Sequence, residues 1–180
     1  MKILVIDVEA TCWDNGDPAK QPINDIIEIG VTPIDITQDR PVMGESESII
    51  VLPTATEISP FCTQLTTLTA EFVKANGRSF KDAIEYLRTK YHTDSLSTDW
   101  ASWGDYDRHA FERQCQRENV AYPFADNSHS NIKALFSQKY GFRCGMDSAL
   151  KKMGIILEGT HHRGIDDSRN IAKILISLGL

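Results

Sequence analysis

The chain has 180 residues, of which 41% are hydrophobic and 24% charged, as in an ordinary globular protein, and this length predicts one domain over residues 1–180. The net charge of −6 argues against a broad, non-specific nucleic-acid binder, which is usually basic over a whole face, but it is compatible with an enzyme that grips a phosphodiester through metal ions. No run of about 20 apolar residues is present, so the sequence predicts a soluble, cytoplasmic protein with no membrane partner. The four cysteines form no Cys-x-x-Cys pair, so a structural zinc site is not expected.

The N-terminal segment combines a buried strand with two acids. Residues 3–6 are branched aliphatics, and Asp7 and Glu9 follow them directly. Because side chains in a strand alternate between its two faces, Asp7 and Glu9 project from the same face and Val8 points away. Two interpretations remain open at this point. The acids mark either a strand end in solvent or half of a site for a divalent cation such as Mg²⁺ or Mn²⁺.

The remaining elements predict an α/β fold. A polar turn is expected at 13–18, and strands at 26–31 and 48–52 continue the first strand as an antiparallel meander. A fourth strand is expected at 98–103, and a short fifth strand near 143–145. Helices are expected at 69–74, from a Ser79 cap onward, and at 107–119, 130–141, 146–153 and 166–178. In the helix of 130–141, Leu135 shares its expected buried face with Ile132 and Phe136. The order predicts a mixed five-stranded sheet with helices on both faces.

Further acids stand at the ends of the later elements. Asp107 opens the helix that follows the fourth strand, and Asp167 opens the final helix, five positions after His162. Each residue also has an ordinary explanation, because acids are favoured in the first turn of a helix and most loop histidines have no catalytic role. Their joint occurrence with Asp7 and Glu9 is harder to explain as chance.

The set Asp7-x-Glu9, Asp107 and His162-x-x-x-x-Asp167 resembles the DEDDh branch of the DnaQ-like 3′–5′ exonucleases. Within that branch, residues 6–12, 58–69 and 162–172 are similar to the family of histone-mRNA 3′-end and RNAi-enhancing exonucleases and its bacterial relatives. The resemblance covers nearly the whole chain. Of two neighbouring acids, Asp105 and Asp107, Asp107 matches the family, since Phe111 then follows four residues later.

The resemblance implies an RNase H-like fold and a metal-dependent mechanism. It implies that Asp7, Glu9, Asp107 and Asp167 hold two divalent ions, Mg²⁺ or Mn²⁺. Two such ions can generate hydroxide from water and stabilise the leaving oxygen, and a phosphodiester needs both because its anionic oxygens repel nucleophiles. It also implies that His162 is the general base, a role that fits an imidazole at neutral pH. His161 is not assigned this role, because only His162 keeps the four-residue gap to Asp167.

The resemblance further implies that Ala10, Thr11, Phe61 and Leu65 cradle the terminal nucleotide, although core packing explains the same residue types equally well. Additional stacking candidates are Trp13, Trp103 and Tyr106, and Arg108 and Arg163 are candidates for contacts with phosphate.

The sequence therefore predicts a 3′–5′ exonuclease that releases nucleoside 5′-monophosphates from single-stranded 3′ ends of RNA, and possibly of DNA. The alternative is a regulatory or nucleic-acid-binding protein that keeps this fold and acts through a protein partner. Eukaryotic members often carry an N-terminal nucleic-acid-binding extension, for which this chain has no room, so specific recognition of an RNA hairpin is not expected.

Overall fold

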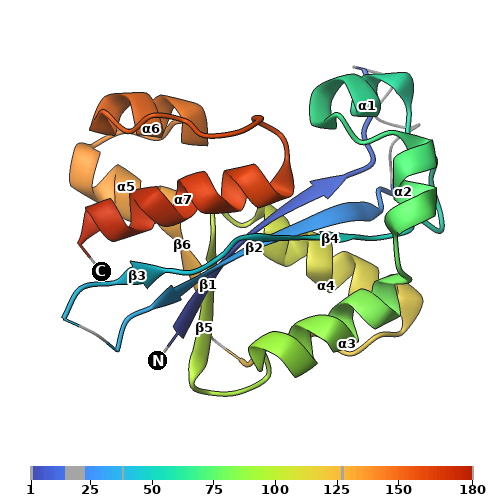
Figure 1. The fold of residues 1–180 in the computed structure, drawn as a ribbon, viewed down its shortest axis with the longest axis horizontal. Coiled ribbons are helices and arrows are strands. Elements are labelled where there is room, and N and C mark those ends of the chain that lie inside the picture. The colour runs from blue at the N-terminus through green and yellow to red at the C-terminus, as the bar shows by residue number, and fades with distance from the viewer. Residues whose placement is uncertain (1, 15–22, 38, 127, 180) are drawn as a thin grey trace.

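A mixed β-sheet forms the centre of the chain, as Figure 1 shows for this computed structural model. The structure describes residues 2–14, 23–37, 39–126 and 128–179; most of the turn predicted at 13–18 therefore lies outside the described residues. Five strands follow one another in the order β3-β2-β1-β5-β6, and β4 also pairs with β2. The strands are β1 (Lys2–Ala10), β2 (Ile26–Asp35), β3 (Val42–Met43), β4 (Glu47–Ile50), β5 (Thr98–Ser102) and β6 (His129–Asn131).

Strand β1 is central because its aliphatic residues are covered on both faces. It runs antiparallel to β2 along its whole length and parallel to β5. The pairing with β5 ends at Val5–Ala101, so the last residues of β1 have a strand neighbour only on the β2 side. This leaves an open edge at the carboxyl end of β1, a position at which ligands collect in α/β sheets.

Helices cover both faces of the sheet (Figure 1). One face packs against α3 and α4 through a core that includes Trp100 and Phe111, and the other packs against α5, α6 and α7. A third apolar cluster holds α1 and α2 against the ends of β2 and β4. The helices are α1 (Pro60–Thr66), α2 (Ala70–Asn76), α3 (Phe80–Tyr91), α4 (Tyr106–Glu118), α5 (Ile132–Tyr140), α6 (Met146–Met153) and α7 (Gly164–Leu178). In the part of the chain that the structure describes, no helix is long and apolar enough to span a membrane.

The predicted mixed sheet with helices on its faces is confirmed, but two local predictions are wrong. Residues 143–145 form no strand; the strand beyond β5 is β6, whose residues His129–Asn131 are all polar and give no apolar pattern to detect. Leu135 is 36% exposed rather than buried, because α5 turns only Ile132 and Phe136 towards the sheet. The Ser79 cap is confirmed, since its hydroxyl accepts a hydrogen bond from the backbone N–H of Asp82 at 3.1 Å.

At the start of α7, the backbone is in direct contact with the backbone of β2. A Cβ atom added to Gly30 would lie 1.9 Å from the carbonyl carbon and oxygen of Gly164, and a Cβ on Gly164 would lie 3.0 Å from the carbonyl oxygen of Asp7. Only glycine at position 30 permits this approach. The approach brings the first turn of α7, and Asp167 with it, over the carboxyl end of β1.

Candidate metal and catalytic site

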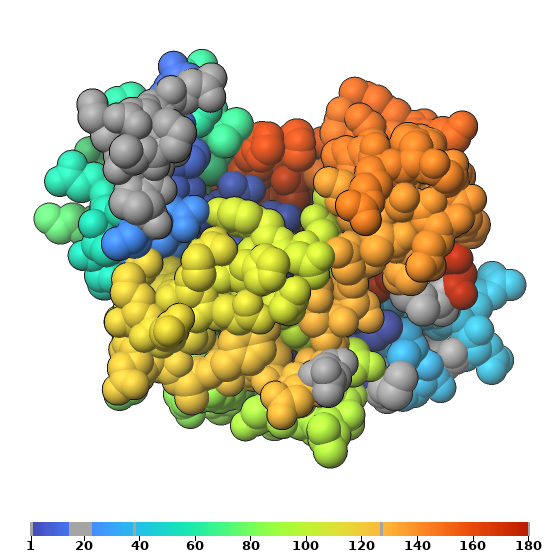
Figure 2. Space-filling view, turned by 180° about the vertical axis from the view of Figure 1, so that it is seen from behind, coloured from blue at the N-terminus to red at the C-terminus, as the bar shows by residue number. Residues whose placement is uncertain are grey.

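The open end of β1 lies in a cavity of about 410 Å³. Figure 2 shows a hollow in which blue atoms of the N-terminal strand are visible at the bottom, between the yellow-green start of α4 and the orange α5–α6 segment. The cavity is lined by residues from β1, α1, α4, α6 and α7, from the loop before α7, and from the segment that follows β5. Its ionisable residues are Asp7, Glu9, Asp107, Asp167, His161 and His162, together with Cys12 and Tyr106.

Asp7 and Glu9 lie on one face of β1, as the alternation of side chains requires. One oxygen from each, together with one from Asp167, falls within a group of atoms that all lie within 4.8 Å of one another. Val8, between them, is 5% exposed, and its side chain packs in the core under α3 and α4.

Asp107 reaches the same cavity from the first turn of α4. Its Oδ1 accepts a hydrogen bond of 2.9 Å from the backbone N–H of Val8, which lies beyond the last β1–β5 pair and has no strand partner on that side. The Asp107 side chain thus replaces the missing neighbour strand. Asp105, the other candidate acid, is largely exposed and pairs with Arg108 and Asn131.

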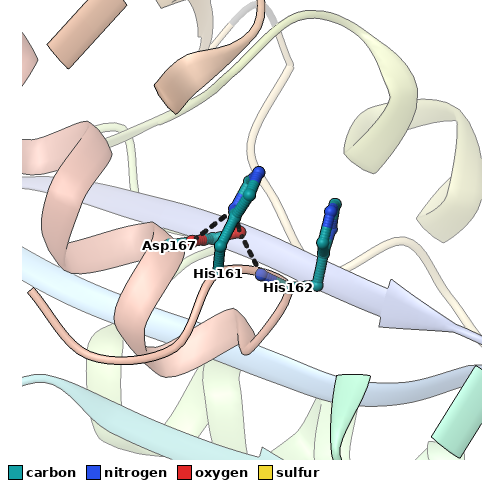
Figure 3. A group of neighbouring side chains, drawn as sticks. All are labelled: His161, His162 and Asp167. Atoms are coloured by element: carbon teal, nitrogen blue, oxygen red, sulfur yellow. Dashed lines mark hydrogen bonds and ion pairs between the residues drawn. The ribbon is translucent and has the colours of Figure 1, made fainter. Parts of the chain in front are cut away.

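Asp167 is 4% exposed and is held by the two histidines of the preceding loop (Figure 3). Nδ1 of His161 lies 2.9 Å from its Oδ2, and the backbone N–H of His162 donates to the same oxygen at 3.0 Å. The two imidazole rings stack with centroids 3.9 Å apart. His162 adopts a left-handed backbone conformation with φ of 66°, which is uncommon for a residue other than glycine.

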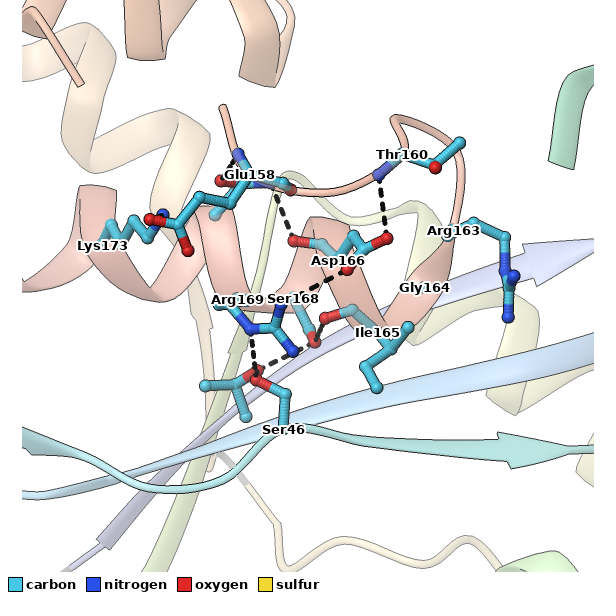
Figure 4. A network of polar contacts seen from close by, with 12 residues as sticks. Ser46, Glu158, Thr160, Arg163, Gly164, Ile165, Asp166, Ser168, Arg169 and Lys173 are labelled. Carbon is cyan, nitrogen blue, oxygen red and sulfur yellow. Dashed lines mark hydrogen bonds and ion pairs between the residues drawn. The ribbon is translucent and has the colours of Figure 1, made fainter. Parts of the chain in front are cut away.

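A second network fixes the start of α7. The fully buried Glu28 of β2 accepts hydrogen bonds from the Gly164 backbone N–H at 2.9 Å and from the Arg163 guanidinium at 3.1 and 3.2 Å. In Figure 4, Asp166 accepts a hydrogen bond from the backbone N–H of Thr160. This bond holds the loop that carries His161 and His162, here called the histidine loop, against the start of α7. Sequence reasoning missed Glu28 because it treated residues 26–31 as a strand only. The signal was an acid in a run of apolar residues, which requires a partner when it is buried.

Arg169 adds a further tie within the network of Figure 4. Its guanidinium bonds to the hydroxyl of Ser46 at 3.2 Å and to the Asp166 carboxylate at 3.4 Å, so α7 is also held to the segment before β4.

The predicted nucleotide-binding residues lie in different surroundings. Ala10 and Leu65 line the cavity, as do Trp103 and Tyr106, whereas Thr11, Phe61 and Trp13 are not among the lining residues. The hydroxyl of the buried Thr11 accepts from the backbone N–H of Asp25 at 2.9 Å and lies 2.8 Å from the Thr56 hydroxyl.

The two candidate phosphate contacts are both engaged in ion pairs. Arg108 pairs with Asp105 and Glu112, and Arg163 pairs with Glu28.

Burial raises the pKa values of all four carboxyl groups, and the charges of neighbouring carboxylates raise those of Asp7 and Glu9 further. Burial, then the charges of Asp167, Glu28 and Asp107, raise the pKa of Glu9 to about 8, and burial, then Asp107 and Glu9, raise the pKa of Asp7 well above its usual range. Burial raises the pKa of Asp107 to about 6 against the lowering effect of the Val8 N–H. The pKa of Asp167 is also raised by burial, although His161 opposes the shift.

These side chains fit hard divalent cations. Carboxylate oxygens are the ligands that Mg²⁺ and Mn²⁺ prefer, and a bound divalent cation would offset the cost of ionising these buried groups. Arg163 lowers the pKa of Glu9, but its guanidinium is bound to Glu28.

The family model of the RNase T exonucleases matches residues 4–175. The chain belongs to this family. The predicted membership of the DEDDh exonucleases is confirmed, and with it the assignment of a 3′–5′ exonuclease domain. A solved structure, the nuclease domain of 3′hExo, a DEDDh family member, bound to rAMP, is 26% identical and superposes with a TM-score of 0.80; the match covers 98% of this chain and 90% of the other.

Two curated relatives cover the chain almost completely. The 3′-5′ exonuclease Snipper of Drosophila melanogaster is 24% identical over 98% of this chain and 68% of its own length. The human 3′-5′ exoribonuclease 1 is 29% identical over 98% of this chain but only 52% of its own length. The chain therefore spans about half to two thirds of these two exonuclease relatives.

The raised pKa of Glu9 predicts how the stability of the metal-free protein depends on pH. Between the usual pKa of 4.5 and about 8, the folded state holds a proton that the unfolded state releases, so the free energy of unfolding falls as pH rises through this window. We expect the melting temperature in EDTA to fall by several degrees from pH 5.5 to pH 8. Glu9→Gln should flatten the slope, and Glu71→Gln, on the exposed surface of α2, should not. Equal slopes in all three proteins would contradict the account.

Proposed function

We propose that this DEDDh exonuclease domain is metal-dependent and hydrolyses phosphodiester bonds at single-stranded 3′ ends, preferring RNA and releasing nucleoside 5′-monophosphates. The observation that carries the proposal is that four carboxylates from three separate parts of the sequence and two histidines line one cavity. The choice of RNA is supported by the relative named an exoribonuclease and by the related nuclease domain bound to rAMP.

Asp7, Glu9, Asp107 and Asp167 would hold two Mg²⁺ or Mn²⁺ ions. Bound there, divalent cations would supply Lewis acidity and offset the negative charge of the phosphodiester. The chain's own contribution is to hold four oxygen donors in place before the ions bind. Val8 fixes Asp107, and His161 and the His162 backbone fix Asp167.

His162 is the proposed general base that takes a proton from the attacking water. Burial, then the neighbouring His161, lowers its pKa below the usual value near 6.5, so its imidazole is neutral and able to accept a proton at pH 7. Among the described residues its ring nitrogens have no hydrogen-bond partner, whereas Nδ1 of His161 is occupied by Asp167. This division leaves His162 free to act on the water and gives His161 a positioning role.

The terminal nucleotide would lie against the apolar part of the lining. Ala10 and Leu65 provide apolar surface in the cavity, and Trp103 and Tyr106 provide aromatic surface. Such groups stack on any base, which suits an enzyme that removes successive nucleotides without reading their identity.

Neutralising a single carboxylate tests the proposed metal site. We expect Asp107→Asn and Asp167→Asn each to lower the Mg²⁺-dependent release of mononucleotides from a 5′-labelled RNA oligomer by at least about a hundredfold, because each would remove one negative ligand. Asp105→Asn, two positions away and exposed, is the matched control and should retain activity. Melting curves confirm that the variants fold. Full activity in both cavity variants would refute the metal site.

A comparison of the two histidines tests the proposed base. We expect His162→Ala to lower kcat by about 10²-fold to 10⁴-fold with little change in KM, and to remove the acidic limb of the pH–rate profile. His161→Ala should keep that limb and should instead raise the metal concentration needed for half-maximal rate, since it frees Asp167. The reverse pattern would assign the base to His161.

A further inference from the structure

One segment of this acidic protein carries a clear excess of basic over acidic residues. Residues 132–153, which comprise α5, α6 and the turn between them, contain five basic residues and one acidic residue. The segment thus carries a formal charge of +4, and the rest of the chain carries −10. We call residues 132–153 the basic hairpin.

The basic hairpin forms part of the wall of the catalytic cavity. Gly145 and Met146, at the start of α6, line the cavity together with Trp103. The indole N–H of Trp103 donates to the carbonyl oxygen of Cys144 at 3.3 Å, which ties the turn of the hairpin to the end of β5. A Cβ built on Gly104, the residue after Trp103, would lie 3.9 Å from Cδ of Lys133. In Figure 2 the orange atoms of this region stand beside the hollow.

The hairpin presents both charge and an aromatic ring to solvent. Its other basic side chains are exposed, while Lys133 is half-buried; they are Lys139, Arg143, Lys151 and Lys152. Lys151 is paired with Asp147 at 2.7 Å. Phe142 is 42% exposed and packs edge-to-face on the buried Phe136, with ring centroids 5.6 Å apart. Phe136 therefore holds the Phe142 ring in position at the surface.

The other walls of the cavity offer no comparable charge. Helix α1 contributes Leu65 and contains no charged residue. Helix α4 has three acids and three arginines, and Arg108, in its first turn, is bound to Asp105 and Glu112. A polyanion that leaves the cavity therefore meets an excess of positive charge only at the hairpin, among the described residues.

We propose that the basic hairpin is the surface that binds the single strand 5′ of the terminal nucleotide, an inference that rests on the proposed function. Lys133, Arg143 and Lys152 contact successive phosphates without reading sequence, and a base stacks on the exposed face of Phe142. The hairpin supplies affinity for the strand, whereas the carboxylate cavity supplies the chemistry.

The proposal predicts that the hairpin matters only for substrates long enough to reach it. The test variant is the triple substitution Lys133→Gln, Arg143→Gln, Lys152→Gln. The matched control is Lys74→Gln, Lys81→Gln, Arg40→Gln, which removes three positive charges from residues that do not line the cavity. KM and kcat are measured in Mg²⁺ for a twelve-nucleotide single-stranded RNA and for the dinucleotide ApA, over a range of salt concentrations.

For the test variant we expect KM for the long RNA to rise by about tenfold or more at low salt, with kcat unchanged. The slope of log KM against log salt should fall by about 2, as expected when three phosphate contacts to a single strand are lost. Both parameters for ApA should match those of the unsubstituted chain. The control triple should resemble the unsubstituted chain with both substrates, and Phe142→Ala should raise KM for the long RNA alone.

The outcomes separate this inference from the proposed function. If the unsubstituted chain hydrolyses neither substrate, the proposed function fails. If it hydrolyses both, and the test and control triples have the same KM for the long RNA, the hairpin proposal is overturned and the proposed function stands. Should the test triple fail to fold, Arg143→Glu, at an exposed position in the turn, carries the same comparison.

Discussion

The structure depends on holding four carboxyl groups together out of water. Burial disfavours the ionised form of Asp7, Glu9, Asp107 and Asp167 and raises the pKa of each, and the charges of neighbouring carboxylates raise those of Asp7 and Glu9 further. Four buried carboxyl groups stay in place only if each is held by a part of the fold other than the remaining three. Here the pleat of β1 fixes the first two, a backbone N–H fixes the third, and the histidine loop fixes the fourth. The cluster is thus prepared for cations that relieve the repulsion.

The geometry of the cluster is set partly by residues outside it. Asp167 can face Asp7 and Glu9 only because Gly30 lets the start of α7 touch β2, and because Glu28 binds both the Gly164 N–H and Arg163 there. Glu28 is therefore a buried acid with a structural task, next to acids with a proposed chemical one. The difference lies in their partners: Glu28 has a guanidinium, and the four cavity acids share no such cation among the described residues.

Much of this arrangement could be predicted from local patterns. The alternation of β1 predicts Asp7 and Glu9 on one face, because it follows from backbone geometry. For Asp107, which has an ordinary explanation as an acid in the first turn of a helix, the resemblance to the family is what predicts a place in the site. The polar strand β6 carries no apolar period, and the sequence therefore predicts the fifth strand near 143–145, where none forms. Contacts between distant elements, such as Glu28 with Arg163, leave no spacing in the sequence to detect. The excess charge of residues 132–153 is visible in the sequence, but its place beside the cavity required the fold.

The central claim is that the carboxylate cavity removes nucleotides one at a time from a 3′ end with the help of divalent cations. The most direct measurement follows a 5′-labelled single-stranded RNA over time on a sequencing gel, with Mg²⁺, with Mn²⁺ and with EDTA, and identifies the released products by chromatography. The account predicts a ladder that shortens by single nucleotides from the 3′ end, with nucleoside 5′-monophosphates as products, in either metal and not in EDTA. Cleavage at internal positions, nucleoside 3′-monophosphates as products, or equal hydrolysis in EDTA would contradict it.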